Sequence, residues 1–313
     1  MIYRSPFRTW EALARVKMKS AHPGAWLKGG AGKWLPDDPW SVAAHPDLSE
    51  TIRPQVSAAL LLARLDFTVQ LENACISRVA RDIAGRALPG EYPEQMVIDA
   101  LRVQCDEAYH ALLALELSAH VERLAGVGRV RYEHHFLAQI ERVQHAAGCA
   151  DAMRIAFCAA VVAETVITKM LRDDWHDQEV QRDVRAFFMH HCRDEARHSA
   201  YFSQALRIVW PQWEPRTRSA LQPLWRDLIT WFVLPDAAVE NAVLVAAGVG
   251  GSDAARIVND CRLRACAASG RRVSVEATLL SLKRAGICEG GPDEPIPHAA
   301  SAAARESMSE TLS

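Results

Sequence analysis

The chain has 313 residues, 50% of them hydrophobic, and its 36 basic and 38 acidic side chains leave a formal net charge of −2. A chain of this size can bury a substantial core, and its hydrophobic content is too high for a disordered protein. Because acidic and basic residues are interleaved and nearly balanced, the composition argues against a nucleic acid as partner.

The first 50 residues predict a short helix over about 6–19, followed by an irregular arm rich in Trp, Gly and Pro. A glycine-rich run at 28–33 resembles a phosphate-binding loop. It lacks the required Ser or Thr and the first glycine, so no nucleotide site is expected there. The arm could cover the rest of the protein or lie in a dimer interface, through Trp26, Trp34 and Trp40.

The sequence predicts a cytoplasmic protein that does not span a membrane. Its first ten residues lack the apolar core of a signal peptide. The most apolar stretch, 153–171, is interrupted by Glu164 and followed by charged residues, which favours a buried helix over a membrane span. The 8 cysteines have no Cys-x-x-Cys spacing and indicate free thiols in a reducing compartment.

From residue 53 onward the chain has helical periodicity and no strand-like alternation. Pro54 suits the first turn of a helix and Gly85 the end of one, which predicts a helix over 54–84. Pro93 and Gly126 bound the next helix in the same way. The remaining predicted segments are helices at 133–147, 150–174 and 178–210, two or three more over 215–287 with a break at Pro235, and a disordered tail at 289–313.

The pentapeptide Asp-Glu-Ala-x-His occurs twice within these helices, at 106–110 and at 194–198. In each copy a Glu and a His stand three residues apart, so both lie on one helix face about 4.5 Å apart along the axis. Each copy also follows an apolar helix that carries one glutamate near its middle, Glu72 in the first case and Glu164 in the second.

Four carboxylates and two imidazoles in this arrangement are what two iron or manganese ions require at the centre of a four-helix bundle. A buried carboxylate without a partner is costly, and two divalent cations would neutralise four of them. The lack of a thiolate among the ligands favours iron or manganese over zinc. The six candidate ligands are Glu72, Glu107, His110, Glu164, Glu195 and His198.

Three further residues lie on the same helix faces. His191 precedes Glu195 by four residues and His198 by seven, so it is either a third imidazole ligand, a support for a ligand, or a packed core residue. Asp106 and Asp194 each lie four residues before a candidate ligand histidine. Each could accept the outer N–H of its own or of the opposite imidazole and so fix the orientation of the ring.

The pattern resembles the p-aminobenzoate N-oxygenase family of non-haem diiron enzymes over about 50–290. The extra histidine distinguishes this family from ferritins, acyl desaturases and ribonucleotide reductase small subunits. The resemblance implies an all-α, ferritin-like four-helix bundle with additional C-terminal helices, forming a diiron oxygenase domain over 51–288. Seven residues stand at the family's ligand positions in order: Glu72, Glu107, His110, Glu164, His191, Glu195 and His198.

The resemblance also implies an activity: two iron ions, with manganese as the alternative, activate dioxygen and oxidise a primary amine to a hydroxylamine, nitroso or nitro compound in natural-product biosynthesis. A diiron hydroxylase or desaturase acting on carbon, and a ferritin-like iron-handling protein, are the alternatives. The family tends to form homodimers. An external reductase or ferredoxin is expected, because no flavin, haem or iron–sulfur motif is visible.

The substrate is less well defined by the sequence. Thr168, one turn after Glu164, is expected to face the metal centre or to hydrogen-bond to its own helix. Ala111 and Ala114 would leave room on the same side of the second helix. No basic residue stands out as an anchor for a substrate carboxylate, so aryl and aliphatic amines are both candidates.

Overall fold

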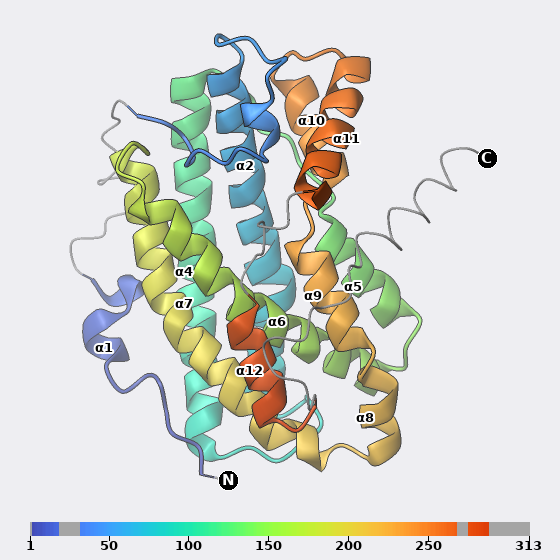
Figure 1. Cartoon of the computed structure of the whole chain (residues 1–313). Coiled ribbons are helices and arrows are strands. Elements are labelled where there is room, and N and C mark those ends of the chain that lie inside the picture. The colour runs from blue at the N-terminus through green and yellow to red at the C-terminus, as the bar shows by residue number, and fades with distance from the viewer. Residues whose placement is uncertain (1, 19–31, 268–274, 288–313) are drawn as a thin grey trace.

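Long helices lying side by side form the body of the computed structural model, which describes residues 2–18, 32–267 and 275–287 (Figure 1). No strand occurs within these ranges, in agreement with the all-α prediction. A π-helical turn, Glu72–Ile76, joins α2 to α3, so that these two helices form one continuous rod. The four rods of the bundle are α2 (Arg53–Leu71) with α3 (Ser77–Ala84), α4 (Glu94–Ala125), α6 (Cys149–His176) and α7 (Arg182–Val209).

The ends of the rods follow the signals in the sequence. Pro54 lies in the first turn of α2, where its missing N–H has no intrahelical partner to lose. Gly126 ends α4 with a φ of 67°, in the left-handed region that glycine enters without strain. The shorter helix α5 (His135–His145) lies within the predicted segment 133–147.

Two apolar clusters fill the bundle, one on each side of a polar layer. On α4 the first cluster includes Met96, Ala100 and Val103, and the second includes Leu113 and Leu117. The residues between them on this helix, 106–110, belong to the repeated pentapeptide. On α7 the order is reversed, with the second cluster before the polar residues and the first cluster after them, so the polar layer lies in the middle of the bundle with apolar packing on both sides.

The predicted N-terminal helix over 6–19 is wrong in extent. The structure has only α1 (Trp10–Leu13) and a 3₁₀ turn, Arg15–Lys17, separated by Ala14 in an extended conformation. Packing against the bundle sets this backbone, since Phe7, Trp10 and Ala14 are all buried. Local helical periodicity alone does not report such long-range contacts.

The arm after this segment lies against the bundle. Lys33 N donates to Glu179 O at 2.8 Å and Gln181 N donates to Lys33 O at 2.9 Å, which ties the arm to the loop between α6 and α7. Gly32 has a φ of 140°, and a Cβ there would lie 2.7 Å from Glu179 O, so this position requires glycine. Trp34 is buried and Trp40 is half-buried, whereas Trp26 and most of the glycine-rich run lie outside the described residues.

The C-terminal region contains more helices than the two or three predicted. Short breaks divide it, and Pro223 and Pro235 lie at two of them. The Asp236 carboxylate caps the helix after the second break by accepting from Ala238 N and Val239 N. The predicted disordered tail, 289–313, lies outside the described residues. The five helices are α8 (Pro215–Leu221), α9 (Leu224–Val233), α10 (Ala237–Ala246), α11 (Gly251–Ala267) and α12 (Glu276–Arg284).

One segment, 215–246, is long and apolar enough by composition to cross a membrane, and 33% of its most apolar window is buried. This is weak evidence for a membrane span, because the segment is divided among α8, α9 and α10. The longest of these helices has 10 residues. A helix of that length rises about 15 Å, roughly half the thickness of the hydrocarbon core of a bilayer.

Candidate metal centre

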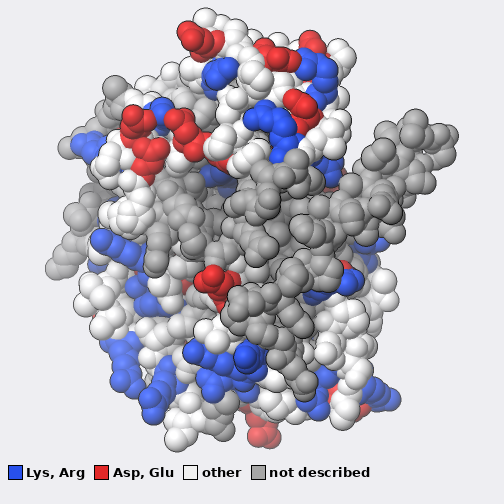
Figure 2. Space-filling view, in the orientation of Figure 1, with Lys and Arg blue, Asp and Glu red and all other residues white. Residues whose placement is uncertain are grey.

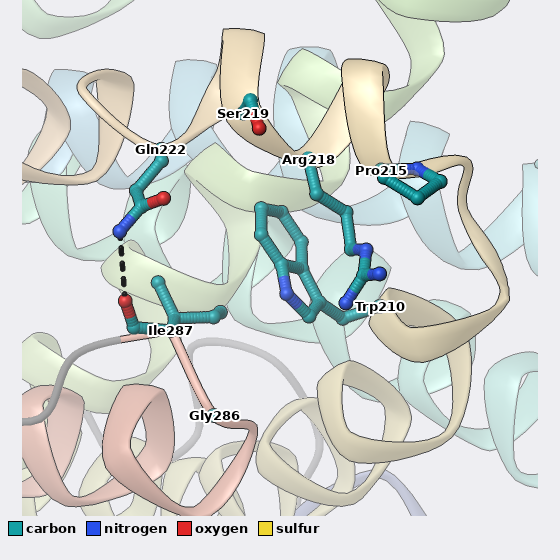
Figure 3. A pocket seen from close by; sticks show the side chains of 7 residues that line it. All are labelled: Trp210, Pro215, Arg218, Ser219, Gln222, Gly286 and Ile287. Carbon is teal, nitrogen blue, oxygen red and sulfur yellow. Dashed lines mark hydrogen bonds between the residues drawn. The ribbon is translucent and has the colours of Figure 1, made fainter.

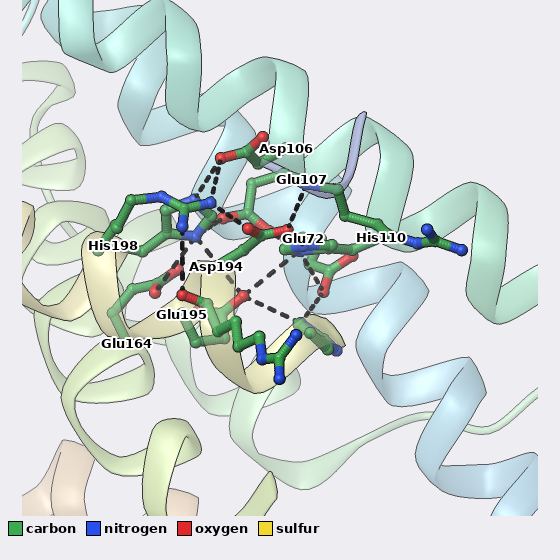
Figure 4. Close-up of polar contacts among 12 residues, drawn as sticks. Glu72, Asp106, Glu107, His110, Glu164, Asp194, Glu195 and His198 are labelled. Carbon is green, nitrogen blue, oxygen red and sulfur yellow. Dashed lines mark hydrogen bonds and ion pairs between the residues drawn. The ribbon is translucent and has the colours of Figure 1, made fainter. Parts of the chain in front are cut away.

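The seven predicted ligand side chains converge in the polar layer, and each has at most 3% of its surface exposed. They come from all four rods. Glu72 lies on the π-helical turn, two ligands on α4, one on α6 and three on α7. Figure 4 shows the labelled carboxylates and imidazoles directed toward one another in the interior. The sequence therefore identified residues that the fold brings together.

The π-helical turn begins at Glu72 itself. Such a turn adds one residue to a helix and shifts the face on which later side chains lie, and it is often found at functional sites. Here the rod presents Glu72 to the polar layer and then Val79 and Ile83 to the first apolar cluster. No feature of the sequence indicated this irregularity.

The ligand atoms form two groups that share Glu195. In the first group, Glu72, His110, His191 and Glu195 have ligand atoms within 4.8 Å of one another. His191 Nε2 lies 3.0 Å from Glu72 Oε1 and 2.9 Å from Glu195 Oε1. His110 Nδ1 lies 3.3 Å from the same Glu195 oxygen. His191 therefore lies among the carboxylates rather than behind them.

The second group comprises Glu107, Glu164, Glu195 and His198, again with ligand atoms within 4.8 Å of one another. His198 Nδ1 lies 2.7 Å from Glu107 Oε1 and 3.9 Å from Glu164 Oε2. The other oxygen of Glu107 lies 3.3 Å from His110 Nδ1 in the first group. Glu107 and Glu195 thus contact imidazoles of both groups, and both carboxylates would help to hold a pair of metal ions.

Protons balance the buried charge when no metal does. Burial, followed by the charges of Glu195 and Glu107, raises the pKa of Glu164 well above its usual range. Burial also raises the pKa of Glu72 to about 7. Burial opposes protonation of His110 and His198, but the adjoining carboxylates raise the pKa of both well above the usual value.

The donor set fits a pair of divalent cations. Among the described residues, several buried ligand atoms have no hydrogen-bond partner. Unpaired buried oxygens of this kind are costly, and metal ions would satisfy them. Oxygen and imidazole donors without thiolate suit iron or manganese. The atoms without a hydrogen bond include Oε2 of Glu72 and Oε2 of Glu195.

The two aspartates of the pentapeptides support the imidazoles crosswise. His110 Nε2 lies 3.1 Å from Asp194 Oδ2, and His198 Nε2 lies 3.2 Å from Asp106 Oδ2. Of the two arrangements that the sequence allowed, the structure has each aspartate behind the opposite histidine. A carboxylate at Nε2 holds the proton on that nitrogen and leaves Nδ1 directed at the centre as a donor.

The N-terminal segment contributes residues that the sequence did not indicate as part of the site. Trp10 Nε1 donates to both oxygens of Asp106 at 2.9 Å. The Phe7 ring stacks on the His198 imidazole with centroids 5.9 Å apart. Arg15 N donates to Asp194 Oδ2 at 3.4 Å. The segment therefore covers the outer side of both supporting aspartates.

Replacing Trp10 with phenylalanine is expected to lower the free energy of unfolding by about 1–3 kcal/mol, because buried Asp106 loses its indole donor. The affinity for metal should also fall, by roughly tenfold, since Asp106 orients His198. Urea denaturation and competition with a chelator would measure the two effects. Trp40→Phe is the control, and equal effects of both substitutions would contradict this role for Trp10.

The metal-free protein should become less stable as pH rises from 6 to 9. Glu72 has its pKa raised to about 7 and His191 to about 9, so the folded protein holds protons that the unfolded chain releases. That stabilisation is lost as pH rises through the raised values. Bound metal needs deprotonated ligands and should reverse the trend. The midpoint of thermal unfolding of the metal-free protein should fall by roughly 5 °C between pH 6 and pH 9. A midpoint that rises over this range without metal would contradict the raised pKa values.

The predicted pocket residues have mixed outcomes. Thr168 Oγ1 donates to the carbonyl of Glu164 on its own helix and lies 3.4 Å from the carbonyl of Glu195, as the backbone alternative predicted. Ala111 and Ala114 are buried, and Ala114 lies within the second apolar cluster. The predicted role of these three residues in a substrate pocket remains a prediction.

One cavity of the described structure lies away from the metal ligands. It has a volume of about 170 Å³ and is bordered by residues from η4 (Trp210–Gln212), α8 and the end of α12. Figure 3 shows Trp210 and Arg218 on its walls, with Gln222 hydrogen-bonded to the carbonyl of Ile287. None of the seven candidate ligands borders it, so its size alone does not make it the active site.

A helical bundle with two adjoining groups of buried carboxylates and imidazoles is the architecture of a ferritin-like metal-dependent oxidase or oxygenase. Comparison with family models places the chain more narrowly. Residues 41–280 match the family described as p-aminobenzoate N-oxygenase AurF, and the chain belongs to this family. A search of curated proteins found no match. Family membership identifies the chain as an oxygenase and agrees with the resemblance noted in its motifs.

Proposed function

We propose that the protein binds two iron ions and uses dioxygen to oxidise a primary amine to a hydroxylamine, and further to a nitroso or nitro compound. The observation that carries this proposal is the pair of ligand groups joined by Glu195 and containing three imidazoles. Membership of the N-oxygenase family supports it. We assign Glu72, Glu107, His110, Glu164, His191, Glu195 and His198 as the ligands.

The first oxidation consumes one amine, one dioxygen, two electrons and two protons, and gives a hydroxylamine and water. The iron ions would supply the electrons that reduce dioxygen, and oxygen would be transferred to the amine nitrogen beside them. Asp106 and Asp194 hold the imidazoles in orientation, and the apolar clusters exclude bulk water from both ends of the site. A reductase or ferredoxin is the proposed source of the two electrons.

The decisive experiment is anaerobic loading with ferrous iron, measurement of bound metal, and exposure to ¹⁸O-labelled dioxygen with a panel of aryl and aliphatic amines. The expected result is two iron ions per chain and labelled oxygen on nitrogen in the product. Label on carbon, or loss of two hydrogens, would favour a carbon hydroxylase or desaturase. Iron uptake far beyond two ions without product would favour iron handling. Manganese loading tests the alternative metal.

We further propose that the enzyme is a cytoplasmic homodimer. The six cysteines described in the structure are free thiols, which suits a reducing compartment. Along α4, exposed apolar or small side chains recur at alternating steps of three and four residues, the spacing of a coiled-coil seam. Such a stripe can pair with its own copy about a twofold axis. Its members are Ile98, Leu101, Cys105, Ala108, Leu112, Leu115 and Ala119.

Changing both Leu101 and Leu112 to glutamate is expected to convert the dimer to a monomer. These side chains are 52% and 41% exposed in the single chain, so the substitutions should leave its core intact. Analytical ultracentrifugation would report the mass, and circular dichroism would confirm that the helices persist. A variant that remains a dimer would place the interface elsewhere on the protein.

A further inference from the structure

A chain of hydrogen bonds runs from a proposed metal ligand to the N-terminal segment, residues 2–18. His198 Nδ1 faces the second ligand group, and its Nε2 lies 3.2 Å from Asp106 Oδ2. The same oxygen of Asp106 accepts from Trp10 Nε1 at 2.9 Å. The Trp10 indole, 6% exposed, is the outer end of this chain. Three side chains therefore connect the ligand layer with the surface segment of the protein.

Two cations lie against the Trp10 ring. Lys17 Nζ is 4.7 Å from the ring centroid, and the central carbon of the Arg102 guanidinium is 5.7 Å from it. The Lys17 side chain is 40% exposed and that of Arg102 is 27% exposed. A protein that contacted these two cations from solution would therefore be one side chain away from the indole.

The surface around Trp10 is basic. Residues 2–18 contain four basic side chains and one acidic side chain, Glu11, which lies 3.0 Å from Lys17. Hydrogen bonds between the backbone of Arg4 and the amide of Gln204 hold the segment against α7. Figure 2 shows mostly Lys and Arg side chains at the lower left of the molecule, where Figure 1 places α1. We define the basic patch as Arg4, Arg8, Lys17 and Arg102.

A series of aromatic rings also leaves the same imidazole. The Phe7 ring stacks on His198, Tyr201 packs edge-on against Phe7, and Tyr3 packs edge-on against Tyr201. These rings meet only by van der Waals contact. Electron tunnelling couples two centres better through hydrogen bonds than across van der Waals gaps of similar total length. The hydrogen-bonded chain is therefore the better coupled of the two connections.

We propose that His198, Asp106 and Trp10 form the path by which electrons enter the metal centre, and that the basic patch docks an acidic protein carrying a one-electron iron–sulfur cluster. The inference rests on the proposed function, which requires two electrons from outside. Electron-transfer complexes are small and transient, and complementary charge guides their formation. A basic surface over the outer end of the path suits such a partner.

The electron balance is simple. Each transfer oxidises the cluster of the partner by one electron and reduces the metal centre by one electron. Two transfers convert a ferric pair to a ferrous pair, and no bond forms or breaks. Lys17 and Arg102 disfavour the loss of an electron from the indole, because their charges oppose a positive charge on the ring. Trp10 therefore couples the two centres without being oxidised itself.

The docking surface is tested by calorimetric titration of the iron-loaded protein with an acidic ferredoxin of the plant type. Arg8→Glu and Lys17→Glu should each weaken binding by about threefold to tenfold, because each reverses a charge of the basic patch. Salt at about 0.5 M should weaken binding by the wild-type protein. Arg226→Glu makes the same change of charge at an exposed position on α9 and is the control. Equal weakening by all three substitutions, or no binding by the wild-type protein, would overturn the docking surface.

The path is tested by stopped-flow absorption, which follows reduction of the ferric protein by reduced ferredoxin and, separately, by dithionite. Trp10→Phe removes the indole N–H and should slow reduction by ferredoxin at least about tenfold. Excess iron keeps this variant loaded. Dithionite is small and needs no docking surface, so its rate should stay that of the wild-type protein. Lys17→Glu leaves the contact between Trp10 and Asp106 in place and should slow only the reaction with ferredoxin.

Three results would overturn the path. An unchanged rate with ferredoxin in Trp10→Phe would show that electrons enter elsewhere. Equal slowing with ferredoxin and dithionite would show that Trp10 acts only by supporting Asp106. Slowing by Tyr3→Leu in place of Trp10→Phe would favour the series of rings. Trp40→Phe is the control for loss of an indole elsewhere in the chain.

The outcome is separable from that of the proposed function, because reduction is followed without amine. Reduction that depends on Trp10 in a protein that oxygenates no amine would overturn the proposed reaction and leave the path standing. Oxygenation of an amine by a protein whose reduction is independent of Trp10 would overturn the path alone.

Discussion

Replacing Glu195 with glutamine is expected to abolish the binding of both metal ions. One oxygen of this side chain lies 3.3 Å from His110, 2.9 Å from His191 and 3.5 Å from His198. Glu195 is also the one residue that belongs to both ligand groups. An amide has no charge to neutralise a cation. Its NH₂ group offers only hydrogen-bond donors where the carboxylate offers a second acceptor oxygen.

Bound iron should fall from two ions per chain to below about 0.5, and amine oxidation should fall by at least about 100-fold. Inductively coupled plasma mass spectrometry and product analysis would measure the two quantities. Glu141→Gln is the matched control, because that glutamate is 71% exposed on α5. Retention of both ions by Glu195→Gln would show that the two groups are independent sites.

Replacing His191 with alanine is expected to remove one of the two ions. His191 belongs only to the first ligand group, whereas Glu107, Glu164, Glu195 and His198 remain in the second. Loss of a neutral donor leaves Glu72 and His110 with too few partners to hold a cation in a buried site. Bound iron should therefore fall from two ions per chain to about one, and dioxygen consumption with amine should fall below about 10% of the wild-type rate.

His145→Ala is the control for this variant, since that imidazole is 78% exposed on α5. Circular dichroism should show the same helical content for both variants. If His191→Ala kept two ions and the full rate of N-oxygenation, His191 would be a packing residue. The distinction matters because the proposed site has three imidazoles only if His191 is a ligand.

The bundle and the ligand layer were predictable from sequence because both are periodic. Spacing of three residues places Glu107 beside His110 on any α-helix, and helices bounded by Pro and Gly are long enough to carry the motif into the core. The crosswise support by the aspartates was one of two alternatives that the spacing allowed. Choosing between them needs the packing of α4 against α7, which local sequence does not encode.

The contributions of the N-terminal segment could not be predicted for a related reason. The Trp10 indole donates a hydrogen bond to Asp106, which is 96 residues away in the sequence. The backbone N–H of Arg15 donates to Asp194, which is 179 residues away. The one available signal was weak: Phe7, Trp10 and Ala14 recur at helical spacing and are all buried. That pattern indicates a face in contact with something, but it does not say which surface of the bundle it covers.

The crossed aspartates give the two pentapeptides a mutual dependence. Asp106 precedes Glu107 and holds His198, while Asp194 precedes Glu195 and holds His110. A half-length polypeptide with one copy would place an imidazole in the core with no acceptor behind it. It could complete the same contacts only by associating with a second copy about a twofold axis. A change at either aspartate of the single chain therefore acts on the pentapeptide of the opposite half.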